Sequence, residues 1–276
     1  MGRMKIIVPL LVIGIFVLTS LARADTGTFF QIKERNEIRV GVRTNSPPFG
    51  FVDKEGESKG FDVDVTKMLA RKLFGDSIAV RFVPVTAHNG IDLLNAGVVD
   101  IVVGPALTAE REREAQFTIP YFISGHLILE RGDERPISLR DLAGKKVAVV
   151  KGSTSENILA TLGATRVGFR TIGDAVGALR KGSVDAIVGQ DEMLFAAEKE
   201  YPELMMADWR PFAVEQCCFA VRKGEVDWAG LASDGLRRSV KTSEFRGLLE
   251  KWFGLPRALL YERTLVSAMK SNRKPT

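Results

Sequence analysis

The chain of 276 residues has few of the residue types that build metal centres and disulfide frameworks. Its two histidines are His88 and His126, and its two cysteines are the neighbours Cys217 and Cys218. Adjacent strand residues point to opposite faces, and a disulfide between neighbours needs a strained ring. We therefore expect two small apolar residues in a strand rather than a disulfide. These residues have no familiar metal-ligand spacing, so we expect no metal and no other cofactor.

The sequence also lacks a basic stripe with interleaved aromatic residues, which single-stranded nucleic acid requires. The net charge is +5, and part of the basic excess lies near the chain ends, at Arg3, Lys5, Arg23, Lys270, Arg273 and Lys274. We therefore expect no nucleic-acid partner, although a mildly basic surface can help to attract an anionic solute.

Long apolar runs are absent after the N-terminus. Residues 6–18 are almost wholly apolar, follow Arg3 and Lys5, and precede a small-x-small pattern that ends at Ala24. This order predicts a secretory signal peptide over residues 1–24, cleaved after Ala24. The alternative is an uncleaved anchor, which would need roughly 20 apolar residues to cross a bilayer. We expect an exported, periplasmic protein that is soluble after cleavage and acts as a monomer.

Short apolar strands alternate with helices in two successive parts of the mature chain. The first part has the order strand, helix, strand, helix, strand, at residues 38–42, 61–73, 80–85, 89–96 and 101–103. The second part repeats this order and adds a helix, at residues 146–150, 156–162, 167–170, 174–181, 185–188 and 192–200. Such alternation predicts parallel sheets with helices on both faces.

Two further apolar strands are expected between and after these parts, at residues 125–130 and 217–222. Helices follow, and the last of them, residues 243–252, is expected to stop at Gly254. The pattern predicts two α/β lobes joined by two strands. A double connection suits hinge closure around a ligand, and open α/β sheets bind ligands at the carboxyl ends of their strands.

The most informative stretch is residues 104–122. A short buried strand ends at Gly104, and Thr108 then opens a turn that carries Arg111. An arginine just beyond a strand end suits a ligand carboxylate, because its planar fork can bond both oxygens at once. The alternative is a solvated arginine that forms weak surface pairs with neighbouring glutamates.

This stretch resembles the Thr-x-x-Arg signature of bacterial extracellular solute-binding proteins of family 3, which bind amino acids. Further segments resemble motifs of that family in order and at its spacing, at residues 39–42 with 47–49, 60–65, 117–122, 142–149, 151–156, 221–224 and 251–254. The resemblance runs from about residue 36 to residue 256. It implies the type II periplasmic-binding-protein fold, an α/β fold of two Rossmann-like lobes joined by two crossover strands.

The resemblance also implies the organisation of the chain and its partner. Lobe one would contain both ends of the mature chain, so we expect it to comprise residues 25–128 and 222–260, with lobe two at residues 129–221 and a basic tail at residues 261–276. The partner would be the inner-membrane permease of an ABC importer.

A free amino acid presents a carboxylate, an ammonium and a side chain. By the resemblance, Arg111 takes the carboxylate. Ser153 and Thr154 follow one expected strand and open a helix, whose free amides attract a carboxylate. The alternative for these two hydroxyl residues is ordinary helix capping.

Two positions depart from the family's pattern. The family usually holds the ammonium with an acid where this chain has Gln190, whose amide oxygen accepts a bond but supplies no charge. Asp191 could replace that acid or only cap the next helix. The family often has Thr or Ser where this chain has Ala106, while the Gly104 carbonyl can still accept from an ammonium. A dicarboxylate or another anion without an ammonium therefore stays open.

Arg43 bears on specificity, because acidic amino-acid binders of the family place an arginine there against the side-chain carboxylate. Residues 86–89 also resemble that subgroup, but its next arginine is Gly90 here. His88 could compensate or lie on the surface, and Phe49 could pack over the ligand or belong to the loop core. We expect glutamate, aspartate or a relative as the ligand.

Three functions follow as alternatives. The first, which we favour, is a binding protein that closes two lobes on a polar, acidic amino acid without chemistry and delivers it to a permease. The second is an enzyme on the same fold, since periplasmic cyclohexadienyl dehydratases resemble this family. Asp191 or Glu192 could then act as a general acid, but no nucleophile–base pair is visible. The third is a sensory protein that presents its ligand to a receptor.

Overall fold

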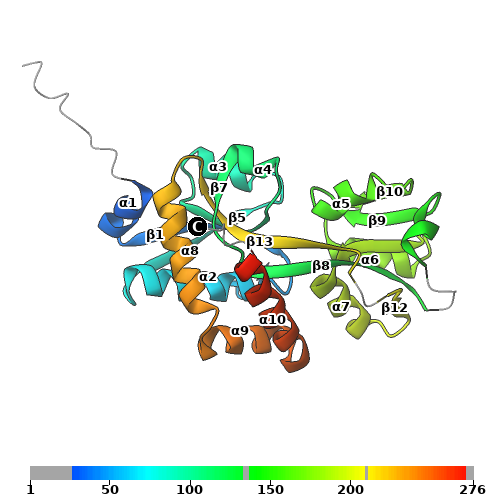
Figure 1. Cartoon of the computed structure of the whole chain (residues 1–276). Coiled ribbons are helices and arrows are strands. Elements are labelled where there is room, and N and C mark those ends of the chain that lie inside the picture. The colour runs from blue at the N-terminus through cyan, green and yellow to red at the C-terminus, as the bar shows by residue number, and fades with distance from the viewer. Residues whose placement is uncertain (1–26, 133–136, 209–210, 272–276) are drawn as a thin grey trace, which may run out of the picture.

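The computed structural model describes residues 27–132, 137–208 and 211–271, so the expected signal peptide lies outside the described residues. Within these ranges, none of the helices combines the length and the apolarity needed to cross a membrane. Figure 1 shows two bodies joined by two long strands, β8 (Phe122–Arg131) and β13 (Ala213–Arg222).

Lobe one is the larger body. Its elements are α1 (Thr28–Arg35), β1 (Glu37–Arg43), β2 (Asn45–Ser46), β3 (Gly50–Val52), β4 (Ser58–Lys59), α2 (Phe61–Phe74), β5 (Ala79–Val85), α3 (Gly90–Asn95), β6 (Ile101–Ala106), α4 (Arg111–Glu114), β7 (Ala115–Phe117), α8 (Val226–Ser239), α9 (Ser243–Phe253) and α10 (Leu255–Ser271). Strand β1 lies between β5 and β6 and is parallel to both. Helix α2 forms where expected, because Val65, Met68 and Leu69 share one buried face.

Lobe two repeats the alternation. Its elements are η2 (Leu139–Leu142), β9 (Lys146–Val150), α5 (Thr154–Leu159), β10 (Thr165–Phe169), α6 (Ile172–Arg180), β11 (Ala186–Gln190), α7 (Asp191–Glu200) and β12 (Leu204–Met206). Strand β9 lies between β10 and β11 and is parallel to both. Alternate residues of β9 face opposite helices: Val149 packs in the cluster of Leu159 from α5, and Ala148 packs with Leu179 from α6. Helices therefore cover both faces, as the sequence predicts.

The two connecting strands make one sheet of both lobes. Its strand order is β10-β9-β11-β8-β13-β6-β1-β5. Strands β8 and β13 pair antiparallel with each other, from Ala213 opposite His126 to Cys217 opposite Phe122. Strand β8 also pairs with β11 of lobe two, and β13 also pairs with β6 of lobe one. The carboxyl ends of the parallel strands of both lobes therefore face the space between them, as in the type II fold that the motifs imply.

The C-terminal segment differs from the expected basic tail at residues 261–276. A helix does end before Gly254, but the chain forms a new helix, α10, at once. Ala258, Tyr261 and Leu265 recur at helical spacing and are buried in the core of lobe one. The apolar face of this helix, which the charged residues around it obscure in the sequence, makes it part of the fold.

This placement predicts unequal effects of two leucine substitutions on the same helix. Leu265 is 2% exposed and Leu260 is 60% exposed. Leu265→Ala should lower the free energy of unfolding by about 2–5 kcal/mol, because it leaves a cavity in the core. Leu260→Ala, the matched control, should change it by no more than about 0.5 kcal/mol. Urea unfolding of both variants checks this, and equal effects would contradict the packing of α10.

Candidate functional site

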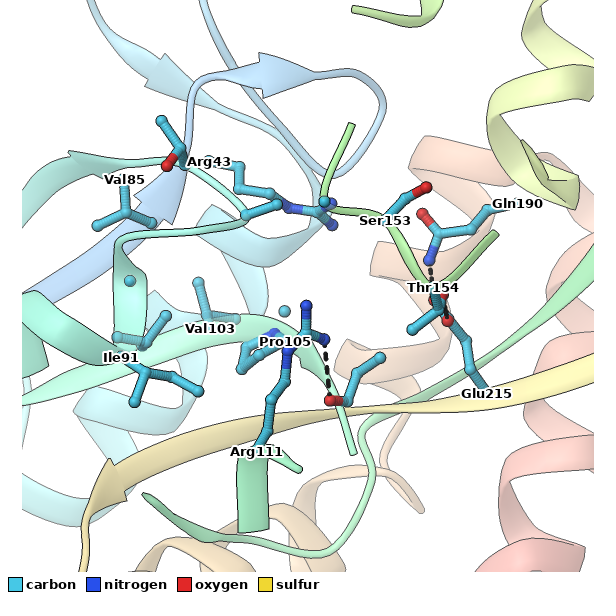
Figure 2. Close-up of a pocket in the computed structure, with 17 residues that line it drawn as sticks. Arg43, Val85, Ile91, Val103, Pro105, Arg111, Ser153, Thr154, Gln190 and Glu215 are labelled. Carbon is cyan, nitrogen blue, oxygen red and sulfur yellow. Dashed lines mark hydrogen bonds between the residues drawn. The ribbon is translucent and has the colours of Figure 1, made fainter. Parts of the chain in front are cut away.

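A cavity lies between the two lobes, at the carboxyl ends of their parallel strands. Its empty volume, part of which is open to solvent, is about 570 Å³. Lobe one supplies Arg43, Thr86, Gly104, Ala106 and Arg111 among others, lobe two supplies Gly152, Ser153, Thr154 and Gln190, and the connecting strand β13 supplies Glu215. Figure 2 shows the arginines on one side of this cavity and Thr154, Gln190 and Glu215 on the other.

Arg111 is held by the loop that the Thr-x-x-Arg pattern builds. The Thr108 hydroxyl accepts from the Arg111 amide at 3.2 Å, and Arg111 Nη1 donates to the Ala106 carbonyl at 3.1 Å. Burial lowers the pKa of Arg111, while the charge of Glu215 opposes that shift. The guanidinium stays charged in any case, so the site contains a partly buried cation, and the alternative of a solvated surface arginine does not fit.

Gly104 is a glycine because of its backbone and its neighbour. Its φ is +91°, which side chains other than hydrogen rarely adopt, and a Cβ there would lie 2.7 Å from Asp62 Oδ2. Asp62 itself is buried, and Tyr121 donates to its Oδ1 at 2.5 Å. Among the described residues, none donates to Asp62 Oδ2. Burial raises the pKa of Asp62 to about 6, against the charge of Arg43 and the bond from Tyr121.

On lobe two, the turn after β9 presents its backbone and hydroxyls to the cavity. Ser153 does not cap α5 with its side chain, since its hydroxyl donates to the Val150 carbonyl at 2.6 Å. The Thr154 hydroxyl donates to Glu215. Gly152 lies against His88 of lobe one, so that a Cβ on Gly152 would come within 2.4 Å of the imidazole ring. His88 is exposed, the second of the two alternatives, but it also makes contact between the lobes beside the cavity.

Glu215 is the cavity residue that the sequence analysis missed. It is only 9% exposed. Its Oε1 accepts from Gln190 Nε2, and its Oε2 accepts from the Thr154 hydroxyl and lies 3.2 Å from His126 Nε2. Burial would raise the pKa of Glu215, but the bond and charge of His126 and the other two bonds outweigh it and hold the pKa below its usual range. Glu215 is therefore an ionised carboxylate.

A signal for Glu215 was present in the sequence. Strand β13 begins at Ala213, four residues before the expected start at Cys217. Because side chains alternate along a strand, Glu215 shares a face with the buried Cys217 and Phe219. A buried carboxylate needs hydrogen-bond or charge partners. An acid on the apolar face of an expected strand could therefore have indicated a polar site there. The two cysteines are free and buried in the same strand.

Two expected site residues do not reach the cavity. Phe49 is 2% exposed and packs with Phe61, Phe122 and Phe253 at ring-centroid distances of 6.1, 5.1 and 5.7 Å. It belongs to the loop core, because the aromatic core of lobe one buries it on every side. Asp191 is also buried, and its carboxylate accepts from the Glu192 amide at 2.9 Å and lies 3.5 Å from the Ser124 hydroxyl. It is the first residue of α7 and is not among the residues that line the cavity.

Two lobes thus face one cavity that is lined by two arginines and one glutamate. The chain belongs to the bacterial extracellular solute-binding proteins, family 3, whose family model matches residues 38–255. It is 34% identical over 190 residues to the glutamine-binding protein of Geobacillus stearothermophilus, which covers 67% of this chain and 72% of the relative. It is 27% identical over 271 residues to the glutamate/aspartate import solute-binding protein of Salmonella typhimurium, which covers 91% of this chain and 89% of the relative.

A solved structure has the same fold. The ancestral amino acid-binding protein AncCDT-1, described as a precursor of cyclohexadienyl dehydratase, matches with a TM-score of 0.75 and 33% identity, over 82% of this chain and 100% of that one. The relatives named here are thus amino-acid-binding proteins, and one of them is an import protein.

The raised pKa of Asp62 predicts a pH dependence of stability. Between its ordinary value of 3.8 and about 6, the folded chain keeps a proton that the unfolded chain has lost. The contribution of Asp62 to stability therefore falls as the pH rises through this window, and is constant above it. Asp62→Asn removes this effect.

The free energy of unfolding of Asp62→Asn, relative to that of the unchanged chain, should thus rise by up to about 3 kcal/mol between pH 4 and pH 7. Urea unfolding of both proteins at intervals of pH measures this difference. A difference that stays constant over the whole range would show that Asp62 titrates alike in the folded and unfolded states.

Proposed function

We propose that this chain is a periplasmic solute-binding protein that captures an acidic amino acid between its lobes, as a monomer, and delivers it to the permease of an ABC transporter. The observation that carries the proposal is the charge of the cavity between the lobes. Of the described residues that line this cavity and the adjoining one, which shares Arg43 and Gln190 with it, Arg43, Arg111, Lys151 and Arg170 are basic, and Glu215 is the one acid. Such a lining favours a solute with net negative charge.

The charges also match the groups of an acidic amino acid one by one. Arg111 would bind the α-carboxylate with its planar fork, beside the backbone of Gly104 and Ala106. The Thr154 amide, at the start of α5, would approach the same carboxylate from lobe two, while the Ser153 amide donates to the Val150 carbonyl at 3.2 Å. Arg43 would then be available for the side-chain carboxylate. A ligand held from both lobes stabilises the closed arrangement, which is how such receptors respond to their solutes.

The enzyme alternative needs a proton donor in the cavity. Burial and the neighbouring Asp191 raise the pKa of Glu192 well above its usual range, so it could carry a proton. Its two oxygens, however, lie 2.9 and 3.1 Å from the Ser124 hydroxyl, and it is not among the cavity residues. Glu215 faces the cavity, but its lowered pKa makes it a poor proton donor. These observations support binding rather than dehydratase chemistry.

The first experiment is a thermal-shift screen of residues 25–276 against all amino acids and small dicarboxylates, followed by calorimetric titration. L-Glutamate or L-aspartate should stabilise the chain by about 2.7 kcal/mol at a hundredfold excess over Kd. Arg111→Ala should raise Kd at least about thirtyfold, because truncating one partner of a buried charge pair costs about 2–5 kcal/mol. Arg113→Ala, on the exposed side of α4, is the control and should leave Kd unchanged. Binding that survives Arg111→Ala would refute the assigned carboxylate site.

A second experiment tests the acidic side chain. Arg43→Gln should raise Kd for L-glutamate at least about tenfold, because it removes a charge-assisted hydrogen bond. L-Glutamine is almost the same shape and carries no side-chain charge, so its Kd should change by less than about threefold. Calorimetric titration of both ligands measures the ratio. If the two affinities fall together, Arg43 does not select the side chain.

A further inference from the structure

Glu215 is a buried carboxylate of the cavity for which the family's expected site pattern has no place. It lies on the connecting strand β13, not at the end of β11, where an acid for the ammonium was expected and Gln190 stands. We propose that Glu215, together with Gln190, is the acceptor for the α-ammonium of the ligand, and that the ligand is therefore a free α-amino acid rather than a dicarboxylate. The inference rests on the proposed function.

The bonding of Glu215 leaves it able to accept an ammonium. A carboxylate offers about four acceptor sites, and the described contacts use three, from Gln190, Thr154 and His126. Gln190 and Thr154 are neutral donors. A ligand ammonium would add a charge of opposite sign in a place shielded from water, where charge-assisted bonds are strongest.

Gln190 connects the expected position of the acid with its actual one. Its amide nitrogen donates to Glu215, and Figure 2 shows its amide oxygen turned away from Glu215. The amide oxygen is an acceptor, and Gln190 and Glu215 both line the cavity. The uncharged Gln190 thus acts together with the negative charge of Glu215 on the connecting strand β13.

His126 positions Glu215 without lining the cavity. Because a carboxylate only accepts, the proton between Glu215 Oε2 and His126 Nε2 belongs to the imidazole. The other ring nitrogen, Nδ1, lies 2.9 Å from the Ser155 hydroxyl, which fixes the ring from the side of α5. His126 pairs with both Gln190 and Ala213 across β8, so Glu215 is its diagonal neighbour in the sheet.

The cavity has one positive and one negative side chain for the two charged groups on the α-carbon of an amino acid. Arg111 and Glu215 line one cavity, and the charge of Glu215 acts on the guanidinium. A zwitterion can satisfy both, with its carboxylate on Arg111 and its ammonium on Glu215. A dicarboxylate such as glutarate would bring a second negative charge toward Glu215 or leave the ammonium position unfilled.

The test compares L-glutamate with glutarate, which has the same chain without the ammonium, by calorimetric titration. The unchanged protein should bind glutamate at least about tenfold more tightly, since hydrogen bonds to charged groups are worth roughly 10- to 100-fold in affinity. Glu215→Gln should weaken glutamate at least about tenfold and leave glutarate unchanged or tighter. Equal affinity of the unchanged protein for the two ligands would overturn the inference without any variant.

Two further variants separate binding from folding. Glu112→Gln removes an exposed carboxylate on α4 and should leave the ratio of the two affinities unchanged. The double variant Gln190→Asp with Glu215→Gln moves the carboxylate across its hydrogen bond to the position the family usually uses. It should restore at least half of the lost preference for glutamate over glutarate, on a logarithmic scale. If the folded double variant still shows no preference for glutamate, the inference is contradicted.

The outcomes also separate this inference from the proposed function. Should glutamate bind in a manner that requires Arg111 while Glu215→Gln leaves the glutamate-to-glutarate ratio unchanged, the inference alone falls and the binding function stands. Should no amino acid or dicarboxylate of the screen bind at all, the proposed function falls first, and the inference falls with it.

Discussion

The antiparallel pairing of β8 with β13 is the constraint on which the site depends. Each of these strands also pairs with a strand of one lobe, so the two lobe sheets are held in register through the connection itself. The same register puts Gln190, His126 and Glu215 on three adjacent strands. The connecting strands thus hold the lobes and also supply one charge of the cavity. A change in their pairing would disturb both the connection of the lobes and the placement of Glu215 in the cavity.

Burial raises the pKa of both Asp62 and Glu215, and their hydrogen bonds decide the net direction for each. Asp62 has a partner for only one of its oxygens among the described residues, and its pKa rises. Glu215 has donors on both oxygens, and its pKa falls despite burial. The chain therefore keeps one carboxyl as part of the core of lobe one and the other as a charge for the cavity. Residue type alone does not distinguish these two environments.

The sequence predicted the elements and the fold well, because hydrophobic alternation and family motifs report local structure. It predicted the loop of Arg111 and the places of Arg43, Gly104, Ala106, Ser153, Thr154 and Gln190 around one cavity. It misplaced Phe49 and Asp191, since a position in a motif does not say whether a side chain turns to the ligand or to the core.

It missed Glu215, which follows all of the expected site residues in the chain. Glu215 reaches the site through the pairing of β13 with β8. It missed α10 because a narrow apolar face among charged residues resembles a tail.

In the proposed complex, one amino acid bridges the opposite charges of Arg111 and Glu215 between the lobes. A crystal structure of residues 25–276 with L-glutamate tests it most directly. We expect the α-carboxylate within hydrogen-bond distance of the Arg111 guanidinium and the α-ammonium within that distance of a Glu215 oxygen, with the side chain directed toward Arg43. A ligand bound in the cavity with its ammonium directed away from Glu215, or with Arg111 bonded only to the Ala106 carbonyl, would contradict it.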